Sequence, residues 1–299
     1  MSIKETIYHH GLHGLVRKLF FFLGHKSSYI AWRFRNAPIY TNPTTVDLEF
    51  IECDLTKLGV TIQDYNPSPE SFKAFQAEDW FPAEYHGGMK SGVWDEKLLE
   101  HWIASDRLEL MSFEQNDIYV DVAAANSPWV KNLHERKGIP AFAIDLNKVG
   151  LAYRHLTYYK REDATNTSFK DESIKGASLH CAFEMFMKDD DTLLIKEAAR
   201  ILRPGCKLVI LPLYMHTHYC TYATPEYYGK GYSDPDATEY IRMDFSGVPS
   251  SRKYDAKTLK IRILDQIESL GMSYQLLAIR NKSELGNNIY CHFILEIIR

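Results

Sequence analysis

The chain lacks glycine at the turn where nucleotide-binding folds usually carry several. An apolar run ending at Val122 is followed by Ala123-Ala-Ala-Asn-Ser127, and no Gly-x-Gly-x-x-Gly motif opens a predicted helix. Such glycines let the backbone approach a dinucleotide pyrophosphate at a helix N-terminus. Their absence disfavours a nicotinamide-dependent oxidoreductase.

Cysteine and clustered positive charge are also scarce. The five cysteines are scattered without a Cys-x-x-Cys pair, which argues against a disulfide framework or zinc knuckle and predicts a reducing, cytoplasmic setting. With 35 basic and 39 acidic residues the net charge is −4, and the absence of a dense Lys/Arg tract argues against a nucleic-acid partner. We therefore expect a small or neutral ligand, and the sequence leaves the oligomeric state open.

Long apolar runs are missing too. The longest strongly apolar run, Leu19–Leu23, is too short to span a bilayer. A buried helical turn is the favoured interpretation of this run. Because Arg17 and Lys18 precede it in an amphipathic pattern, peripheral attachment to a membrane surface is the alternative.

A regular alternation of strands and helices begins near Trp94. Apolar residues from Trp94 to Ile103 recur every three or four positions, which predicts a helix, and strand patterns follow it. The order predicts an α/β fold: a Rossmann-like, mostly parallel seven-stranded sheet with helices on both faces and an antiparallel C-terminal hairpin. The expected strands are Ile118–Val122, Ala141–Leu146, His155–Tyr159, Ala177–Phe183, Lys207–Tyr214, Ser273–Arg280 and Asn288–Ile298.

The first ninety or so residues do not follow this alternation. Prolines at 38, 43, 67, 69 and 82 interrupt any long helix there, so we expect an irregular or helical extension, or a lid, over residues 1–93. Residues 94–299 form the expected domain, with a tyrosine-rich insertion at 215–254. Further helices are expected at Pro128–Lys137, Val149–Tyr153, Thr192–Leu202 and Asp255–Leu270, and the Asp189-Asp-Asp191 run is interpreted as a helix start.

One stretch carries a family resemblance. It begins at Ala182-Phe-Glu-Met-Phe186 and ends with Glu197-Ala-Ala-Arg-Ile-Leu-Arg-Pro-Gly205. Together with the small-residue turn, this stretch resembles the class I S-adenosylmethionine-dependent methyltransferases over roughly residues 94–299. The resemblance implies a methyltransferase that uses S-adenosylmethionine as its cofactor.

The resemblance also implies a set of cofactor-binding residues. Asp121 would anchor the turn or take a hydrogen bond from the methionine ammonium, and Asp145, 24 residues later, would reach the ribose hydroxyls. An alternative for Asp145 is a helix N-cap. The remaining expected positions are Ala123, Ala125 and Ser127, which stand where the family has glycine, and the pair Asp163-Ala164, which would hold adenine.

Alanine restricts how that turn can fold. A positive φ would cost an alanine on the order of 1 kcal/mol or more. We therefore expect Ala123 and Ala125 to follow a variant path with negative φ.

The candidate catalytic residues lie where strands four and five end. His216, His218 and Glu184 are candidate general bases, which a hydroxyl acceptor would require because it must lose a proton. His216, His218 and Cys220 alternate on one predicted strand face, but no further acid lies at a spacing typical of a metal site. Methyl transfer from a sulfonium also needs no metal. We therefore expect no metal site.

The acceptor is suggested by composition. Residues 214–254 hold eight of the nineteen tyrosines, and such rings with polar neighbours suit a sugar or other small polar molecule, although a packed surface loop is an equal alternative. Ser250-Ser-Arg-Lys-Tyr-Asp255 is similar to a run in bacterial surface-polysaccharide members, which suggests polysaccharide biosynthesis. The missing glycines leave a catalytically silent, methyltransferase-like binding or scaffold protein as the alternative.

Overall fold

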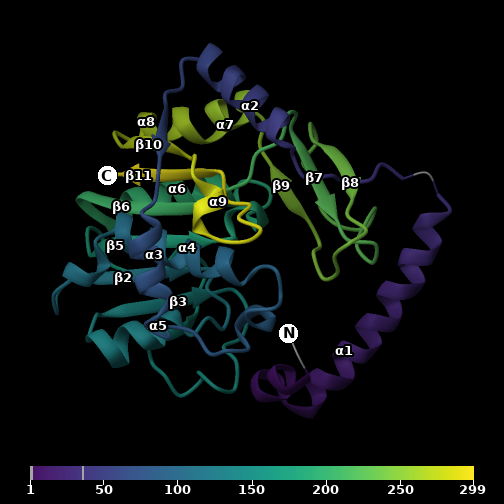
Figure 1. The fold of residues 1–299 in the computed structure, drawn as a ribbon, viewed down its shortest axis with the longest axis horizontal. Helices are drawn as coiled ribbons and strands as arrows, with labels where there is room; N and C mark the ends of the chain where they lie inside the picture. The colour runs from purple at the N-terminus through teal and green to yellow at the C-terminus, as the bar shows by residue number, and fades with distance from the viewer. Residues whose placement is uncertain (1–2, 36) are drawn as a thin grey trace.

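The computed structural model describes residues 3–35 and 37–299 and has one large sheet at its centre (Figure 1). The strand order is β4-β3-β2-β5-β6-β11-β10-β1, and β11 is antiparallel to both of its neighbours while the other pairs are parallel. The strands are β1 (Ile62–Tyr65), β2 (Ile118–Val122), β3 (Ala141–Asp145), β4 (Tyr159–Arg161), β5 (Ile174–His180), β6 (Leu202–Leu213), β10 (Ser273–Ile279) and β11 (Phe293–Ile298). This arrangement confirms the predicted Rossmann-like α/β class and its antiparallel C-terminal strands.

Helices cover both faces of the sheet, as expected. Alternate residues of each strand enter opposite cores: Val120 and Leu208 pack on one side, Tyr119 and Val209 on the other. The first core takes α2 (Thr45–Lys57), α6 (Asp190–Ile201) and the continuous helix formed by α7 (Ala256–Leu259), a π-helical turn (Lys260–Leu264) and α8 (Asp265–Ser269). The second takes α3 (Pro69–Gln76), α4 (Trp94–Arg107) and α5 (Trp129–Asn132), which continues as a π-helical turn to Lys137.

The N-terminal segment is more ordered than the prolines suggested. It contains a 31-residue helix, α1 (Ile3–Arg33), followed by α2. The five prolines fall between these elements or, like Pro69, in the first turn of a helix, where proline is tolerated. The expectation that prolines break any long helix was wrong here because none lies within α1.

The sheet also has one strand more than predicted. β1, from the N-terminal segment, pairs in parallel with β10, with Ile62 opposite Leu276. The sequence of β1 is too short and polar for its periodicity to identify it. Part of the 1–93 segment is therefore built into the sheet.

Several predicted boundaries shift by a few residues. The predicted strand Ala177–Phe183 is Ile174–His180, so His180 is its last residue, and the left-handed Cys181 (φ 52°) follows. The strand predicted at His155–Tyr159 is Tyr159–Arg161, and turns replace the helix predicted at Val149–Tyr153. The last strand starts at Phe293, after a short helix, α9 (Lys282–Leu285).

A second, small sheet occupies most of the 215–254 segment. It has the order β8-β7-β9, formed by β7 (Cys220–Ala223), β8 (Thr238–Ile241) and β9 (Ser251–Lys253). Figure 1 shows it beside the main sheet, between that sheet and α1.

A buried charge network joins the two sheets. Arg252 of β9 is fully buried and donates to both oxygens of Asp234, at 2.7 and 3.0 Å, and to Asp191 in the first turn of α6. Arg262 adds two hydrogen bonds of 2.7 Å to the same Asp191 carboxylate. The acidic run is therefore a helix start, as expected, whose third residue is also the centre of an ion-pair network.

Among the described residues, no helix is both long enough and apolar enough to cross a lipid bilayer.

Replacing Arg252 by methionine should strongly destabilise the protein. Asp191 and Asp234 would be left buried with one partner fewer, and removing one member of a buried ion pair costs about 3–5 kcal/mol. Urea unfolding followed by circular dichroism would measure the loss. Lys57→Ala, which removes an exposed ion pair with Asp54, is the control and should leave the unfolding free energy nearly unchanged. Equal effects of the two substitutions would contradict the assigned role.

Candidate cofactor and active site

The turn after β2 follows the path of a glycine-containing turn although it is built from alanine. Ala123 has φ 54° and Ala125 has φ 49°, both in the left-handed region. The expectation of a variant path with negative φ was therefore wrong. Such a conformation costs a non-glycine residue about 1–2 kcal/mol, so the surrounding contacts must hold it.

Hydrogen bonds from β3, β4 and the loop between them hold this turn. The Ala125 amide donates to Asp145 Oδ2 (2.8 Å), the Gly150 amide donates to Asn126 Oδ1 (2.7 Å), and the Tyr159 hydroxyl donates to the Ser127 carbonyl (2.5 Å). The strained turn is thus fixed by the neighbouring strands rather than by its own sequence.

Asp145, the predicted ribose ligand, is already partly engaged. Its Oδ1 accepts from the backbone and side-chain nitrogens of Asn147, at 2.7 and 2.9 Å, while Oδ2 accepts from Ala125. A carboxylate oxygen has two lone pairs. One acceptor position therefore remains on Oδ2, and the side chain also shapes the loop, as the capping alternative suggested.

Asp121, in contrast to Asp145, accepts no hydrogen bond from the described residues. The residue is 1% exposed, and neither carboxylate oxygen has a hydrogen-bond partner. Burial, with the nearby charge of Asp145, holds the pKa of this carboxyl well above its ordinary value. His180 Nε2 lies 3.8 Å away and is hydrogen-bonded to Ser178 Oγ at 2.8 Å. An orphaned buried carboxylate is costly, and an ammonium group would satisfy it.

The predicted adenine pair lies just after β4. Asp163 is exposed, and its Oδ1 accepts from the amide and hydroxyl of Thr165 at 2.9 and 2.8 Å, which leaves Oδ2 open. Ala164 is buried in the same core as Val122 and Ile144. The pair therefore combines an apolar wall with a free carboxylate oxygen.

Aromatic residues that sequence reasoning missed cover the end of β2. Phe81 and Tyr85 come from the connection between α3 and α4, and Phe81 stacks on Trp129 of α5, with ring centroids 5.9 Å apart. His101 of α4 lies 4.1 Å from His180, again between ring centroids. The aromatic residues beside the turn at His86-Gly87-Gly88 were the available sequence signal. This connection, residues 77–93, covers the buried Asp121 region.

A second group of polar side chains, half of them buried, lies where β5 and β6 end, and we call it the polar cluster. It comprises Lys97, Glu100, Cys181, Glu184, Tyr214 and Tyr290. Cys181 Sγ lies 3.1 Å from the Tyr214 hydroxyl and 3.7 Å from Glu184 Oε1. The second oxygen of Glu184 is buried without a partner.

The rest of the polar cluster comes from α4 and from the loop before β11. Lys97 Nζ donates to Glu100 Oε1 at 2.8 Å, and the Tyr290 hydroxyl donates to the same oxygen at 3.4 Å. Burial raises the pKa of Cys181 to about 11 and that of Tyr214 well above its ordinary value. The thiol and the phenol are therefore neutral near neutral pH. Glu184 was predicted, whereas the α4 residues and Cys181 were not, because no local motif marks them.

The two predicted histidines lie in a different environment. His216 is half-buried beside Tyr40, with ring centroids 5.8 Å apart, and His218 Nε2 is 2.8 Å from the Tyr240 hydroxyl. Burial, followed by the proximity of His218, lowers the pKa of His216. Among the described residues no hydrogen bond, ion pair or ring contact joins either histidine to Glu184 or Asp121.

The alternating His216, His218 and Cys220 do converge. Their candidate ligand atoms lie within 4.8 Å of one another, as do those of His101, Asp121 and His180. Both nitrogens of His218 already lie near hydroxyl groups, Nδ1 at 3.3 Å from Thr217 and Nε2 near Tyr240. The absence of a resident metal stays a prediction.

Comparison with known families identifies the central part of this fold. Residues 120–210, from β2 through most of β6, match the model of a family described as a methyltransferase domain. The chain carries a class I methyltransferase domain. Its cofactor is S-adenosylmethionine. The Ala123–Ser127 turn, Asp145 and the polar cluster lie at the carboxyl ends of the central strands.

Several solved methyltransferase structures are similar to part of this chain at low sequence identity. One is an S-adenosylmethionine-dependent methyltransferase from Mesorhizobium loti, at 17% identity and a TM-score of 0.41, covering 66% of this chain and 98% of that chain. Another is the 1,6-didemethyltoxoflavin-N1-methyltransferase of Burkholderia thailandensis, at 11% identity and a TM-score of 0.41, covering 80% and 93%. A third, from Methanosarcina mazei, has 15% identity and a TM-score of 0.40, covering 62% and 92%. No curated protein matches the chain.

The residues present fit the cofactor of this methyltransferase. The orphaned Asp121 carboxylate suits the methionine ammonium, the remaining lone pair of Asp145 suits a ribose hydroxyl, and the open oxygen of Asp163 beside Ala164 suits an exocyclic amine.

Replacing Ala123 or Ala125 by glycine should stabilise the free enzyme. Glycine removes the left-handed penalty but loses more chain entropy on folding, so we expect a net gain of about 0.5–1 kcal/mol per site. Thermal unfolding of the single variants would measure it. Ala124→Gly is the matched control, because Ala124 is not among the positive-φ residues, and it should lower stability instead. Destabilisation at all three sites would contradict the strained geometry.

The affinity for S-adenosylmethionine should rise with pH. Burial raises the pKa of Asp121, and a neutral Asp121 must lose its proton before it can pair with an ammonium. Below that pKa the affinity should grow by up to about tenfold per pH unit. Calorimetry in two buffers of different ionisation enthalpy would reveal the released proton. Asp121→Asn should bind weakly and without this pH dependence, and a pH-independent wild-type affinity would refute the assignment.

Proposed function

We propose that this methyltransferase methylates a hydroxyl oxygen of a small polar acceptor, with a sugar as the acceptor class, and that Glu184 is the general base. The observation that carries the proposal is the buried, unpartnered Oε2 of Glu184 in the polar cluster. An oxygen acceptor has a proton to lose, and a carboxylate with a free oxygen can take it.

The proposed chemistry needs positioning more than activation. Bound S-adenosylmethionine supplies an electrophilic methyl group on a sulfonium. The acceptor oxygen forms the new carbon–oxygen bond as the carbon–sulfur bond breaks, the hydroxyl proton passes to Glu184, and S-adenosylhomocysteine leaves. The Tyr214 and Tyr290 hydroxyls would orient the acceptor, and the buried surroundings would exclude water.

The small sheet is the proposed acceptor side. Tyr214 connects it to the polar cluster, since its hydroxyl contacts Cys181 while its ring lies 3.6 Å from the ammonium of Lys253. Lys253 is buried on β9 and also faces Tyr222 at 5.1 Å. Tyrosine rings suit the apolar face of a sugar, and an ammonium and hydroxyls suit its oxygens. This arrangement supports assigning residues 215–254 to acceptor binding.

Two further assignments accompany this proposal. Residues 77–93 act as the lid within the 1–93 segment, opening to admit the ligands, and residues 94–299 supply the catalytic domain. A cytoplasmic setting and a place in polysaccharide biosynthesis follow from the scattered cysteines and the Ser250–Asp255 run. In the structure that run is also structural, because Arg252 and Tyr254 bind Asp191.

Substituting Glu184 by glutamine should abolish most turnover while leaving cofactor affinity intact. Loss of a general base typically costs about 10²–10⁴-fold in rate. The measurement is transfer of a labelled methyl group from S-adenosylmethionine to a panel of sugars and nucleotide sugars, with cofactor binding followed by calorimetry.

The histidines provide the comparison for this experiment. His216→Gln and His218→Gln should retain most of the turnover, because their rings contact Tyr40 and Tyr240 and not the polar cluster. If the glutamine variant of Glu184 stays active and a histidine variant does not, the base is that histidine. If the wild type binds cofactor yet methylates nothing in the panel, the proposal of a sugar acceptor is wrong. If no other oxygen acceptor is methylated either, a catalytically silent binding protein becomes the better description.

A further inference from the structure

Among the residues of α1 whose side chains the structure describes, those that contact the loop after β7 form one narrow stripe. Trp32 Nε1 donates to the Pro225 carbonyl at 3.0 Å, His25 Nδ1 lies 2.6 Å from Glu226 Oε2, and the Phe21 ring packs on Tyr227 with centroids 6.3 Å apart. Figure 1 shows the helix running along the outer side of the small sheet, apart from the main sheet. The partners of this stripe all lie in the loop after β7.

The opposite stripe of α1 is apolar and exposed. Val16, Phe20, Leu23 and Ile30 of α1, and Phe34 just after its end, are each between 52% and 83% exposed. Their spacing, with Ser27 in the same series, alternates between four and three residues, which places them on one helix face. Within the helix the face runs from residue 16 to residue 30, a length of about 21 Å at the helical rise per residue. A row of this kind on a soluble surface marks an interaction site.

The charged residues in the stretch of sequence that carries this face are all basic. Between residues 6 and 46 there are five lysines and arginines and no aspartate or glutamate, although the whole chain has a net charge of −4. Lys26 lies over the Phe22 ring at 4.6 Å, and Arg35 lies over the Trp32 ring at 5.1 Å. Apolar side chains bordered by cations match an anionic bilayer, whose acyl region and headgroups they would meet together.

We propose that the exposed face of α1 docks this enzyme onto anionic phospholipid bilayers, with the helix lying in the plane of the interface. A second copy of the chain fits this face less well. Pairing two such faces would bring Lys26 and Arg33 of each copy close to the same uniformly basic stretch, and like charges oppose that pairing. An anionic headgroup layer removes this repulsion.

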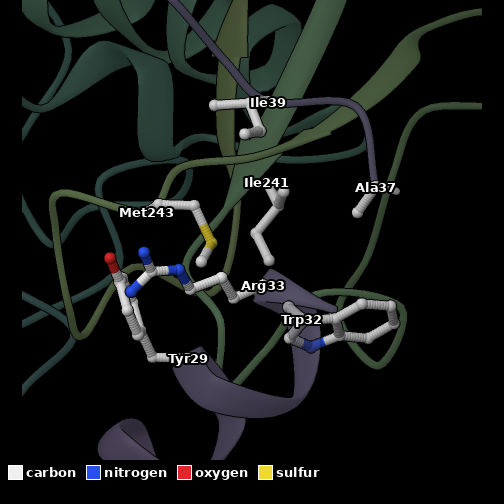
Figure 2. A pocket seen from close by; sticks show the side chains of 7 residues that line it. All are labelled: Tyr29, Trp32, Arg33, Ala37, Ile39, Ile241 and Met243. Carbon is white, nitrogen blue, oxygen red and sulfur yellow. The ribbon is translucent and has the colours of Figure 1, made fainter. Parts of the chain in front are cut away.

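A cavity at the end of α1 supports the same occupant. It has a volume of about 570 Å³ and is lined by Tyr29, Trp32, Arg33, Ala37, Ile39, Ile241 and Met243. Figure 2 shows the Arg33 guanidinium beside the Tyr29 ring, with Met243 and Ile241 on the other side. Arg33 forms no ion pair with another described residue. One unpaired cation between apolar walls suits the phosphate and upper acyl chain of a single anionic lipid.

Vesicle flotation tests the proposal directly. The full-length protein should float with phosphatidylcholine vesicles that contain phosphatidylglycerol and much less with phosphatidylcholine alone, and added salt should weaken the binding. Phe20→Glu combined with Leu23→Glu should reduce the bound fraction at least about tenfold, because charge enters the apolar face. Met111→Glu, at an exposed apolar residue outside α1, is the matched control and should bind like the wild type.

A second variant tests the contribution of the cations separately from that of the apolar face. Lys26→Gln, Arg33→Gln and Arg35→Gln together preserve the apolar face and should still reduce binding about tenfold or more, because the headgroups then lose three attracting cations. Circular dichroism and unchanged affinity for S-adenosylmethionine would show that both multiple variants fold.

Two results would overturn the proposal. One is binding that ignores lipid charge or survives both sets of substitutions. The other is a wild-type protein that does not bind vesicles and is a dimer in light scattering, where the Phe20 and Leu23 substitutions dissociate the dimer. That result would assign the face to a second copy of the chain. Neither result depends on the acceptor or on turnover.

Discussion

The buried guanidinium of Arg252 is the constraint on which the arrangement of the two sheets depends. Its donors reach Asp234 in the loop before β8, Asp191 at the start of α6 and the carbonyls of Phe186 and Lys188. Because a buried charge is tolerated only when fully paired, these segments must assemble together or not at all. The network thereby places the tyrosine-rich small sheet at the carboxyl ends of β5 and β6, beside the polar cluster.

The cofactor turn shows a related dependence on distant residues. Alanine at positions 123 and 125 disfavours the left-handed conformation that both adopt, and hydrogen bonds to Asp145, Gly150 and Tyr159 impose it. Asp145 therefore has two tasks, since one of its oxygens both holds the turn and retains the lone pair available to a ribose. A family that uses glycine gets this geometry from the turn itself, whereas here the neighbouring strands maintain it.

The carboxyl groups at the strand ends are divided between two roles. Asp121 and Glu184 are buried with unpartnered oxygens, which is expensive in the free protein and becomes favourable only when a ligand supplies a donor. Asp191 and Asp234 are buried and fully engaged, and they stabilise the fold. The presence or absence of hydrogen-bond partners thus distinguishes carboxylates available to a ligand from carboxylates that stabilise the fold. The sequence does not distinguish the two kinds.

The sequence by itself determined the fold class, because the alternation of strands with amphipathic helices and the Glu197-to-Gly205 run are local patterns. It also selected the Ala123–Ser127 turn, Asp145 and Glu184 as candidate site residues. It could not decide that β1 joins the sheet, that the alanines take positive φ, or that His216 and His218 sit apart from Glu184. Those features depend on contacts between residues far apart in the chain. α4, for example, brings Lys97 and Glu100 toward Cys181 and Tyr290, and neither periodicity nor spacing encodes that meeting. Local patterns fix which elements form, whereas packing between them decides which side chains share a site.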